Sequence, residues 1–193
     1  FNRYRGENIM ARTTFDGPVR SQNGFIGIGP NMIQPITGTV ADSATNIDKY
    51  QGKVLTIGDA ATVFNLPGII STANNATGGP GTDPNSANNV GMMYEFIVTT
   101  SLTGGNTFVL NAGSSAGGQL ADVFRGMAIY NNTATDPGAV TAFSAGGTDT
   151  LTLTATTKGG LEGAHIKCRA VAGLIWQIEA QLIGNGAFAQ PWS

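Results

Sequence analysis

The sequence is short of the side chains on which most catalytic sites, metal sites and disulfide frameworks depend. Its 193 residues include one cysteine and one histidine, and only 11% of them are charged, whereas an average domain carries about 25%. One cysteine cannot form an internal disulfide. No apolar run reaches the roughly 18 residues of a membrane-spanning helix or has the form of a signal-peptide core. These absences predict a soluble protein without membrane contact that is made in a reducing cytoplasm.

The residues that are abundant favour strands and turns. Lysine and glutamate, both good helix formers, are scarce, whereas threonine, asparagine, glycine (28) and proline (8) are frequent. Hydrophobic residues make up 41% of the chain, which is too many for a disordered composition. The composition therefore predicts an ordered all-β domain that is long enough to bury a sizeable core.

The first 36 residues form a distinct segment. Glycine and proline recur in it too often for a helix or a central strand. Residues 1–30 hold two acidic residues against four arginines, a net charge of +2, while the rest of the chain has a net charge of −4. The overall charge of −2 gives no case for a nucleic-acid-binding protein. We predict an extended basic arm over residues 1–36, suited to an acidic surface, and a β-body over residues 37–193.

Alternation of apolar and polar residues places the strands of the body. Residues 52–67 predict two short strands around a turn at Gly58-Asp59, and residues 92–100 and 106–111 predict a hairpin. Residues 117–132 fit either a strand or a helix. The clearest hairpin covers residues 163–184, where the side chains expected to face the core are Ile166, Cys168, Ala170, Trp176, Ile178, Ala180 and Leu182.

Eight to ten such strands, separated by turn signals, predict an antiparallel β-sandwich or barrel of the jelly-roll kind. Residues 71–89 contain no hydrophobic side chain larger than alanine. They predict a long loop, a feature that is usually functional or mobile in a compact domain.

The residues offer no catalytic or metal-binding constellation. A Cys–His dyad needs both side chains on one face, but in the predicted strand His165 lies with Lys167 and Arg169, opposite Cys168. The glycine-rich stretches "GGPGTDP" and "GFIGIGP" lack the lysine and the spacing of phosphate or dinucleotide loops. The carboxylates are scattered and mostly adjoin turn residues. We expect no enzyme activity, no cofactor and no metal site.

The arm and three stretches of the body share a recognisable pattern. The arm stretch is "ARTTFDGPVRSQNGF" (residues 11–25), and the body stretches are "GKVLTIGDAATVFNLP", "YEFIVTTSLTGGNTFVLNA" and "GGLEGAHIKCRAVAGLIWQIEAQLIGNGAFAQPW". The arm stretch resembles the N-terminal leader of the decoration, or cement, proteins of tailed-phage capsids. The body stretches resemble a strand pattern that is common in phage head proteins.

The resemblance implies a structural virion protein on the outer surface of a phage capsid. It implies a β-rich body that forms a trimer. The trimer binds the expanded shell and stabilises it by bridging major capsid subunits. An arm without a core of its own is useful if it buries surface on a partner, and folding back on its own sheet is the alternative. The arm residues expected to contact the capsid or a neighbouring subunit are Arg3, Tyr4, Arg5, Arg12, Phe15, Arg20 and Phe25.

Two further points stay open on the sequence. Phe188 and Trp192 lie beyond the last clear strand, and they either cover the open end of the core or meet a neighbouring molecule. The alternative function is a receptor- or glycan-binding knob on a phage tail or fibre. Its recognition surface would then be formed by loops such as residues 71–89 and 131–147, with Phe143 as the one large aromatic candidate.

Overall fold

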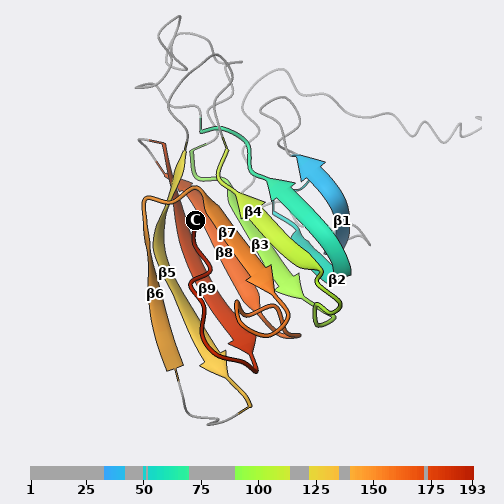
Figure 1. Ribbon diagram of the computed structural model, residues 1–193. Coiled ribbons are helices and arrows are strands. Elements are labelled where there is room, and N and C mark those ends of the chain that lie inside the picture. The colour runs from blue at the N-terminus through green and yellow to red at the C-terminus, as the bar shows by residue number, and fades with distance from the viewer. Residues whose placement is uncertain are drawn as a thin grey trace, which may run out of the picture.

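The computed structural model describes residues 33–41, 50, 52–69, 90–113, 122–134, 140–171 and 174–193. All regular secondary structure in these residues is β-strand, which confirms the predicted all-β class (Figure 1). The strands are β1 (Ile33–Ala41), β2 (Val54–Asn65), β3 (Met93–Val98), β4 (Thr107–Asn111), β5 (Val123–Asn132), β6 (Val140–Gly146), β7 (Thr150–Thr154), β8 (His165–Val171) and β9 (Ile175–Gly184).

The strands form one curled, mixed sheet. Its order is β6-β5-β9-β8-β3-β2-β4-β7, and β1 pairs with β2 outside this path. Four of the eight strand pairs are antiparallel, but β1–β2, β2–β3, β2–β4 and β5–β9 are parallel. The prediction of an antiparallel sheet is therefore wrong for half of the pairs. Parallel neighbours need long crossover connections, and short-range alternation in the sequence carries no signal for these.

Strand β2 explains how the sheet curls. It is one strand of 12 residues, where the sequence predicted two strands around a turn. Its first residues pair with β3 and its last residues pair with β4, while the pairing with β1 shifts between Ile36 and Gly38. Gly58 and Asp59 lie between the two paired halves. The turn residues thus mark a bend within a continuous strand, at which β2 passes from one part of the sheet to the other.

The predicted hairpin of residues 92–111 is wrong. Both strands exist, but β3 and β4 each run parallel to β2 and do not pair with each other. The connection between them packs against the bend of β2, where the Asp59 carboxylate accepts hydrogen bonds from Thr103 N (2.7 Å) and Asn106 Nδ2 (2.9 Å). The Asp59 side chain also accepts a hydrogen bond from the Thr103 hydroxyl. These bonds lower the pKa of Asp59 below its usual value.

The core lies inside the curl and is rich in aromatic rings. Phe64 of β2 meets Phe96 of β3 at 5.1 Å between ring centroids, and Tyr94 of β3 meets Trp176 of β9 at 5.7 Å. Such edge-on aromatic pairs add to the stabilisation from buried area. The β8–β9 hairpin forms as predicted. The side chains expected to face the core are all buried in it: Ile166, Cys168, Ala170, Trp176, Ile178, Ala180 and Leu182.

Two predicted boundaries change. β1 begins at Ile33, so residues 33–36 belong to the sheet and not to the arm; residues 1–32 lie outside the described residues. The stretch 131–147, expected as a loop, contains the end of β5 and the whole of β6, which form a hairpin. The ambiguous stretch 117–132 is a strand where it is described, because β5 lies between two partners, β6 and β9.

Candidate docking surface

One side of the sheet faces away from the core along β3, β8, β9 and β5. Because neighbouring strands are in register, the outward side chains of these strands stand in rows across the sheet. We call this surface the outer face. Its members are Met93, Glu95, His165, Lys167, Arg169, Gln177, Glu179, Gln181, Arg125, Met127 and Ile129.

The middle row of the outer face alternates in charge and then becomes apolar. Glu95 of β3 pairs with Lys167 of β8, Lys167 pairs with Glu179 of β9, and Glu179 pairs with Met127 of β5. Opposite charges on adjacent strands stabilise the register. His165 Nε2 lies 2.7 Å from Glu95 Oε1, and both side chains are partly exposed.

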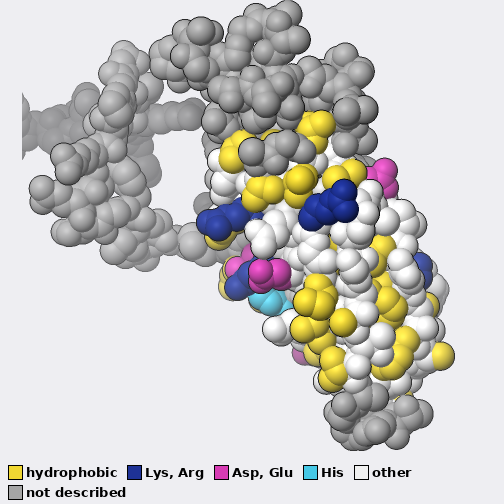
Figure 2. Space-filling view, turned by 90° about the vertical axis from the view of Figure 1, so that its left-hand side faces the viewer, with side chains coloured by type: hydrophobic (Ala, Val, Ile, Leu, Met, Phe, Trp, Pro, Cys, Tyr) yellow, Lys and Arg dark blue, Asp and Glu magenta, His cyan; other side chains and the backbone are white. Residues whose placement is uncertain are grey.

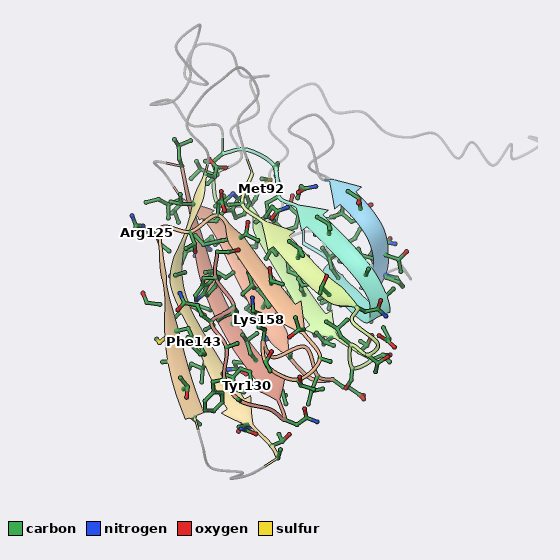
Figure 3. The ribbon with its side chains drawn as sticks, in the orientation of Figure 1. Met92, Arg125, Tyr130, Phe143 and Lys158 are labelled. Atoms are coloured by element: carbon green, nitrogen blue, oxygen red, sulfur yellow. The ribbon has the colours of Figure 1, made fainter. Side chains whose placement is uncertain are left out.

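The other two rows add arginines and apolar side chains. One row runs Met93, Arg169, Gln177 and Arg125, and the other includes His165, Gln181 and Ile129. Figure 3 shows Arg125 near one end of β5 and Tyr130 near the other. The outer face thus carries three basic and two acidic side chains, with the histidine counted as neutral, although the whole chain has a net charge of −2.

Large hydrophobic side chains are exposed on this face. Met93 is 52% exposed, Met127 49% and Ile129 42%. Two adjoining hollows lie beside them, of about 310 and 320 Å³, and Lys167 and Glu179 line both. Figure 2 looks onto the β5–β6 side, where hydrophobic side chains are spread among uncharged ones and charged side chains gather near the single histidine. The surface is uneven, partly apolar and bordered by charge.

The stretch "HIKC" is placed as the sequence predicted. His165 is on the outer face, whereas Cys168 is buried in the core. Burial raises the pKa of the Cys168 thiol far above its usual value, because a thiolate is poorly solvated there. The two side chains therefore do not form a nucleophilic dyad. Within the described part of the chain, no three histidine, cysteine, aspartate or glutamate residues gather to hold a metal ion.

One carboxyl group is buried at the edge of the core. Asp122, just before β5, accepts hydrogen bonds from Ile69 N (2.7 Å) and Trp176 Nε1 (3.3 Å) through Oδ2. Its Oδ1 atom has no hydrogen-bond partner among the described residues. Burial raises the pKa of Asp122, and the two hydrogen bonds oppose this. The side chain links three segments and has a structural role.

The predicted contact residues fall into two groups. The arm residues Arg3, Tyr4, Arg5, Arg12, Phe15, Arg20 and Phe25 lie outside the described residues. Trp192 is buried in the core, 6.2 Å from Phe124 between ring centroids. Phe188 is 37% exposed and packs edge-on against Tyr130 at 4.5 Å.

Sequence reasoning missed the apolar members of the outer face. Met127 and Ile129 alternate with buried Ala128 and Tyr130 along β5, and this period of two was the available signal. This signal was ambiguous because residues 117–132 also fit a helical period. In a helix, Met127 and Ile129 would not continue the rows of side chains on β8 and β9.

Fold and surface together define a class: an all-β protein with a curled mixed sheet that presents one uneven, partly apolar face. No protein-family model, curated protein or solved structure matches the chain. In the described part of the chain, no helix is long and apolar enough to cross a membrane.

Proposed function

We propose that the protein is a non-enzymatic structural component of a phage particle. The protein forms a homo-oligomer, a trimer, of its β-bodies. This trimer binds the outer surface of the capsid and stabilises the expanded shell by bridging major capsid subunits. The observation that carries this proposal is the outer face of the sheet, with its exposed methionines, isoleucine and arginines. The resemblance of the arm to the leader of capsid decoration proteins, and of the body to a strand pattern of phage head proteins, supports the choice of partner.

The composition of the outer face fits a protein partner. Protein interfaces are enriched in methionine and arginine, and they combine an apolar centre with a polar rim. Met127 and Ile129 lie beside the hollow that Lys167 and Glu179 border, and methionine adapts to irregular surfaces. Scattered single apolar residues are normal on a protein surface, but here three large ones share one face with two hollows.

The arm supplies the second contact in this proposal. An extended segment loses about 1–2 kcal/mol per residue of conformational free energy when it is ordered. Burial of Tyr4, Phe15 and Phe25 on the shell offsets part of this loss, and arginine forms charge-assisted hydrogen bonds with acidic groups there. Stabilisation then follows mass action, because a ligand that binds only the expanded shell stabilises it by RT ln(1 + [L]/Kd) per site.

Decoration of purified expanded capsids tests the proposal. We expect deletion of residues 1–30 to abolish co-sedimentation with the shells while the body stays folded by circular dichroism. The double variant Met127→Asp and Ile129→Asp is expected to weaken binding at least tenfold, because it places two charges in the apolar part of the contact. The charge-matched control is a second double variant, Thr39→Asp and Ala61→Asp, at exposed positions of β1 and β2 outside the outer face.

The results separate the two contacts. Full binding by the arm-deleted protein would overturn the role of the arm. Full binding by the Met127→Asp and Ile129→Asp variant would overturn the role of the outer face. If the intact protein fails to bind expanded shells at all, the capsid proposal is wrong.

A further inference from the structure

The curled sheet has three edges, and two of them are protected. β7 pairs with β4 on one side, and on the other it is covered by the C-terminal segment. Thr150 N donates to Ser193 O (3.1 Å), Ser193 N donates to Thr150 O (3.0 Å), and Thr152 N donates to Pro191 O (2.8 Å). These bonds use the backbone groups that an added strand would need.

The β1 edge is blocked by its own sequence. Pro35 has no N–H to donate, and the pairing with β2 is irregular next to Gly38, whose φ is +67°. Proline and bulges are the devices by which proteins keep edge strands from pairing with other chains.

Within the described part of the chain, the β6 edge has no such protection. β6 pairs with β5 on one side and ends the sheet on the other (Figure 1). Its sequence, VTAFSAG, contains no proline and no charged residue. Among the described residues, no backbone hydrogen bond is formed on its free side. An uncharged edge strand without proline is a template for strand addition.

Apolar side chains continue up to this edge. Val140 is 61% exposed, and it stands on the same face as Ile129 and Met127 of β5. Phe143, on the opposite face of β6, is partly buried against the core (Figure 3). A strand added here would extend the backbone pairing and would cover apolar surface on both faces of the sheet.

We propose that β6 pairs antiparallel with β6 of a second copy of this chain, across a twofold axis. A register centred on Phe143 places Val140 opposite Gly146, so the branched valine side chain faces a residue that has no side chain. The same register places Ala142 opposite Ser144, which pairs two small side chains. The two Phe143 rings become cross-strand neighbours on the core side, an arrangement that stabilises antiparallel pairs.

Charge favours a second copy as the occupant. A strand that carries net charge repels its own copy, and β6 carries none. The nearest charged side chain in register is Arg125, opposite Gly146 at one end of β6. In the antiparallel pair the two Arg125 side chains lie at opposite ends, about 20 Å apart for six residues of strand. This exceeds the screening length of about 8 Å at physiological salt.

This contact does not depend on capsid binding. If the protein is otherwise a single chain, the contact joins two chains into a dimer. If trimers form through another surface, the contact joins two trimers into a pair. In either case the isologous contact doubles the mass of the unit that it links.

Sedimentation of the full chain, without shells, tests the proposal. We compare wild type with Ala142→Lys, which adds a charge at the exposed centre of β6, and with Gln181→Lys, which adds the same charge in the same row of the sheet on β9. The wild type and Gln181→Lys are expected to have the same mass, and Ala142→Lys is expected to have half of it. Circular dichroism and thermal melting check that both variants fold.

Three outcomes would overturn the proposal. The first is an unchanged mass for Ala142→Lys. The second is a wild type that sediments as a single chain up to the highest soluble concentration. The third is a threefold or larger fall in mass for Ala142→Lys, which would indicate head-to-tail pairing. If Ala142→Lys keeps its mass but loses binding to expanded capsids, the edge pairs with the capsid protein and not with a second copy.

Discussion

Asp122 is a buried residue whose carboxyl group links two segments of the chain. It joins Ile69, which follows β2, to Trp176 of β9 through two hydrogen bonds. Asp122→Ala is expected to lower the free energy of unfolding by about 2–5 kcal/mol, because it leaves two buried N–H groups without an acceptor. Asp122→Asn keeps an acceptor oxygen and should cost clearly less. Urea unfolding of the three proteins measures the difference, and equal losses for both variants would contradict this role.

The pH dependence of stability provides a second test of Asp122. Burial raises the pKa of this carboxyl above 3.8 in the folded protein, so the folded state binds the proton more tightly than the unfolded state does. The contribution of Asp122 to stability is therefore greatest below the unfolded pKa, and it decreases as the pH rises through the folded pKa. We expect the stability of the wild type relative to Asp122→Asn to fall over this interval. A difference that stays constant with pH would contradict the raised pKa.

Gly126 is one of the glycines at which the structure leaves no room for a side chain. Its φ is +149°, and a Cβ atom at this position would lie 1.9 Å from the carbonyl oxygen of Ile178 on β9. Gly126→Ala is expected to cost at least about 2 kcal/mol through strain and overpacking, which lowers Tm by roughly 4–8 °C for a chain of this length. Gly58→Ala is the matched control, because nothing lies within 4 Å of its Cβ position. Equal melting temperatures for the two variants would contradict the argument.

Single strands were easier to predict than their pairing. Alternation identified β3, β4, β8 and β9, because each strand has one buried face and its period of two is local in the sequence. The β8–β9 hairpin was predicted together with its buried face, since its two strands are joined by a short turn around Leu174, whose φ is +63°. Local pattern and local connection agree there, so the sequence was sufficient.

The parallel pairs could not be predicted. β2 lies between β1 on one side and β3 and β4 on the other, and all of these pairs are parallel. Parallel pairs join segments that are distant in the sequence. The Gly58-Asp59 pair predicts a turn, but turn residues suit both a reversal of the chain and a bend within a strand. Only the pairing partners of β2 distinguish these two structures.

The C-terminal segment acts as an additional strand for β7. Removal of residues 189–193 uncovers the β7 edge and takes Trp192 out of the core. We expect the truncated protein to be at least about 3–5 kcal/mol less stable, the cost typical of Trp→Ala in a core, and to aggregate through the exposed edge. Light scattering and urea unfolding measure both effects.

Trp192→Phe separates packing from edge protection. It retains the backbone bonds to β7 and an aromatic ring beside Phe124, and Trp192 Nε1 has no hydrogen-bond partner in the described part of the chain. This variant should lose less stability than the truncated protein and should stay monodisperse. Aggregation of Trp192→Phe to the same extent would show that loss of core packing, and not the free edge, causes association.

At the scale of the whole molecule, the candidate site was less accessible to sequence reasoning than the core. The sequence predicts that His165, Lys167 and Arg169 share one face of β8, but it does not show which side chains lie beside them. The neighbours of this face in the rows come from β3, β5 and β9, and the Met93–Arg169 pair joins residues that are 76 positions apart in the sequence. A surface formed by register across four strands becomes visible only when the sheet order is known.

The behaviour of whole particles provides the last prediction. A decoration protein that bridges major capsid subunits should be present at about one copy per capsid subunit by quantitative mass spectrometry of purified particles. Its addition to bare expanded shells should raise the shell melting temperature in proportion to the logarithm of its concentration above Kd, because stabilisation follows RT ln(1 + [L]/Kd). The arm-deleted protein is the matched control and should leave the melting temperature unchanged.

A copy number far below one, with no effect on shell melting, would contradict decoration and favour the alternative of a tail or fibre knob. Binding to host cells would then replace shell binding as the property to measure.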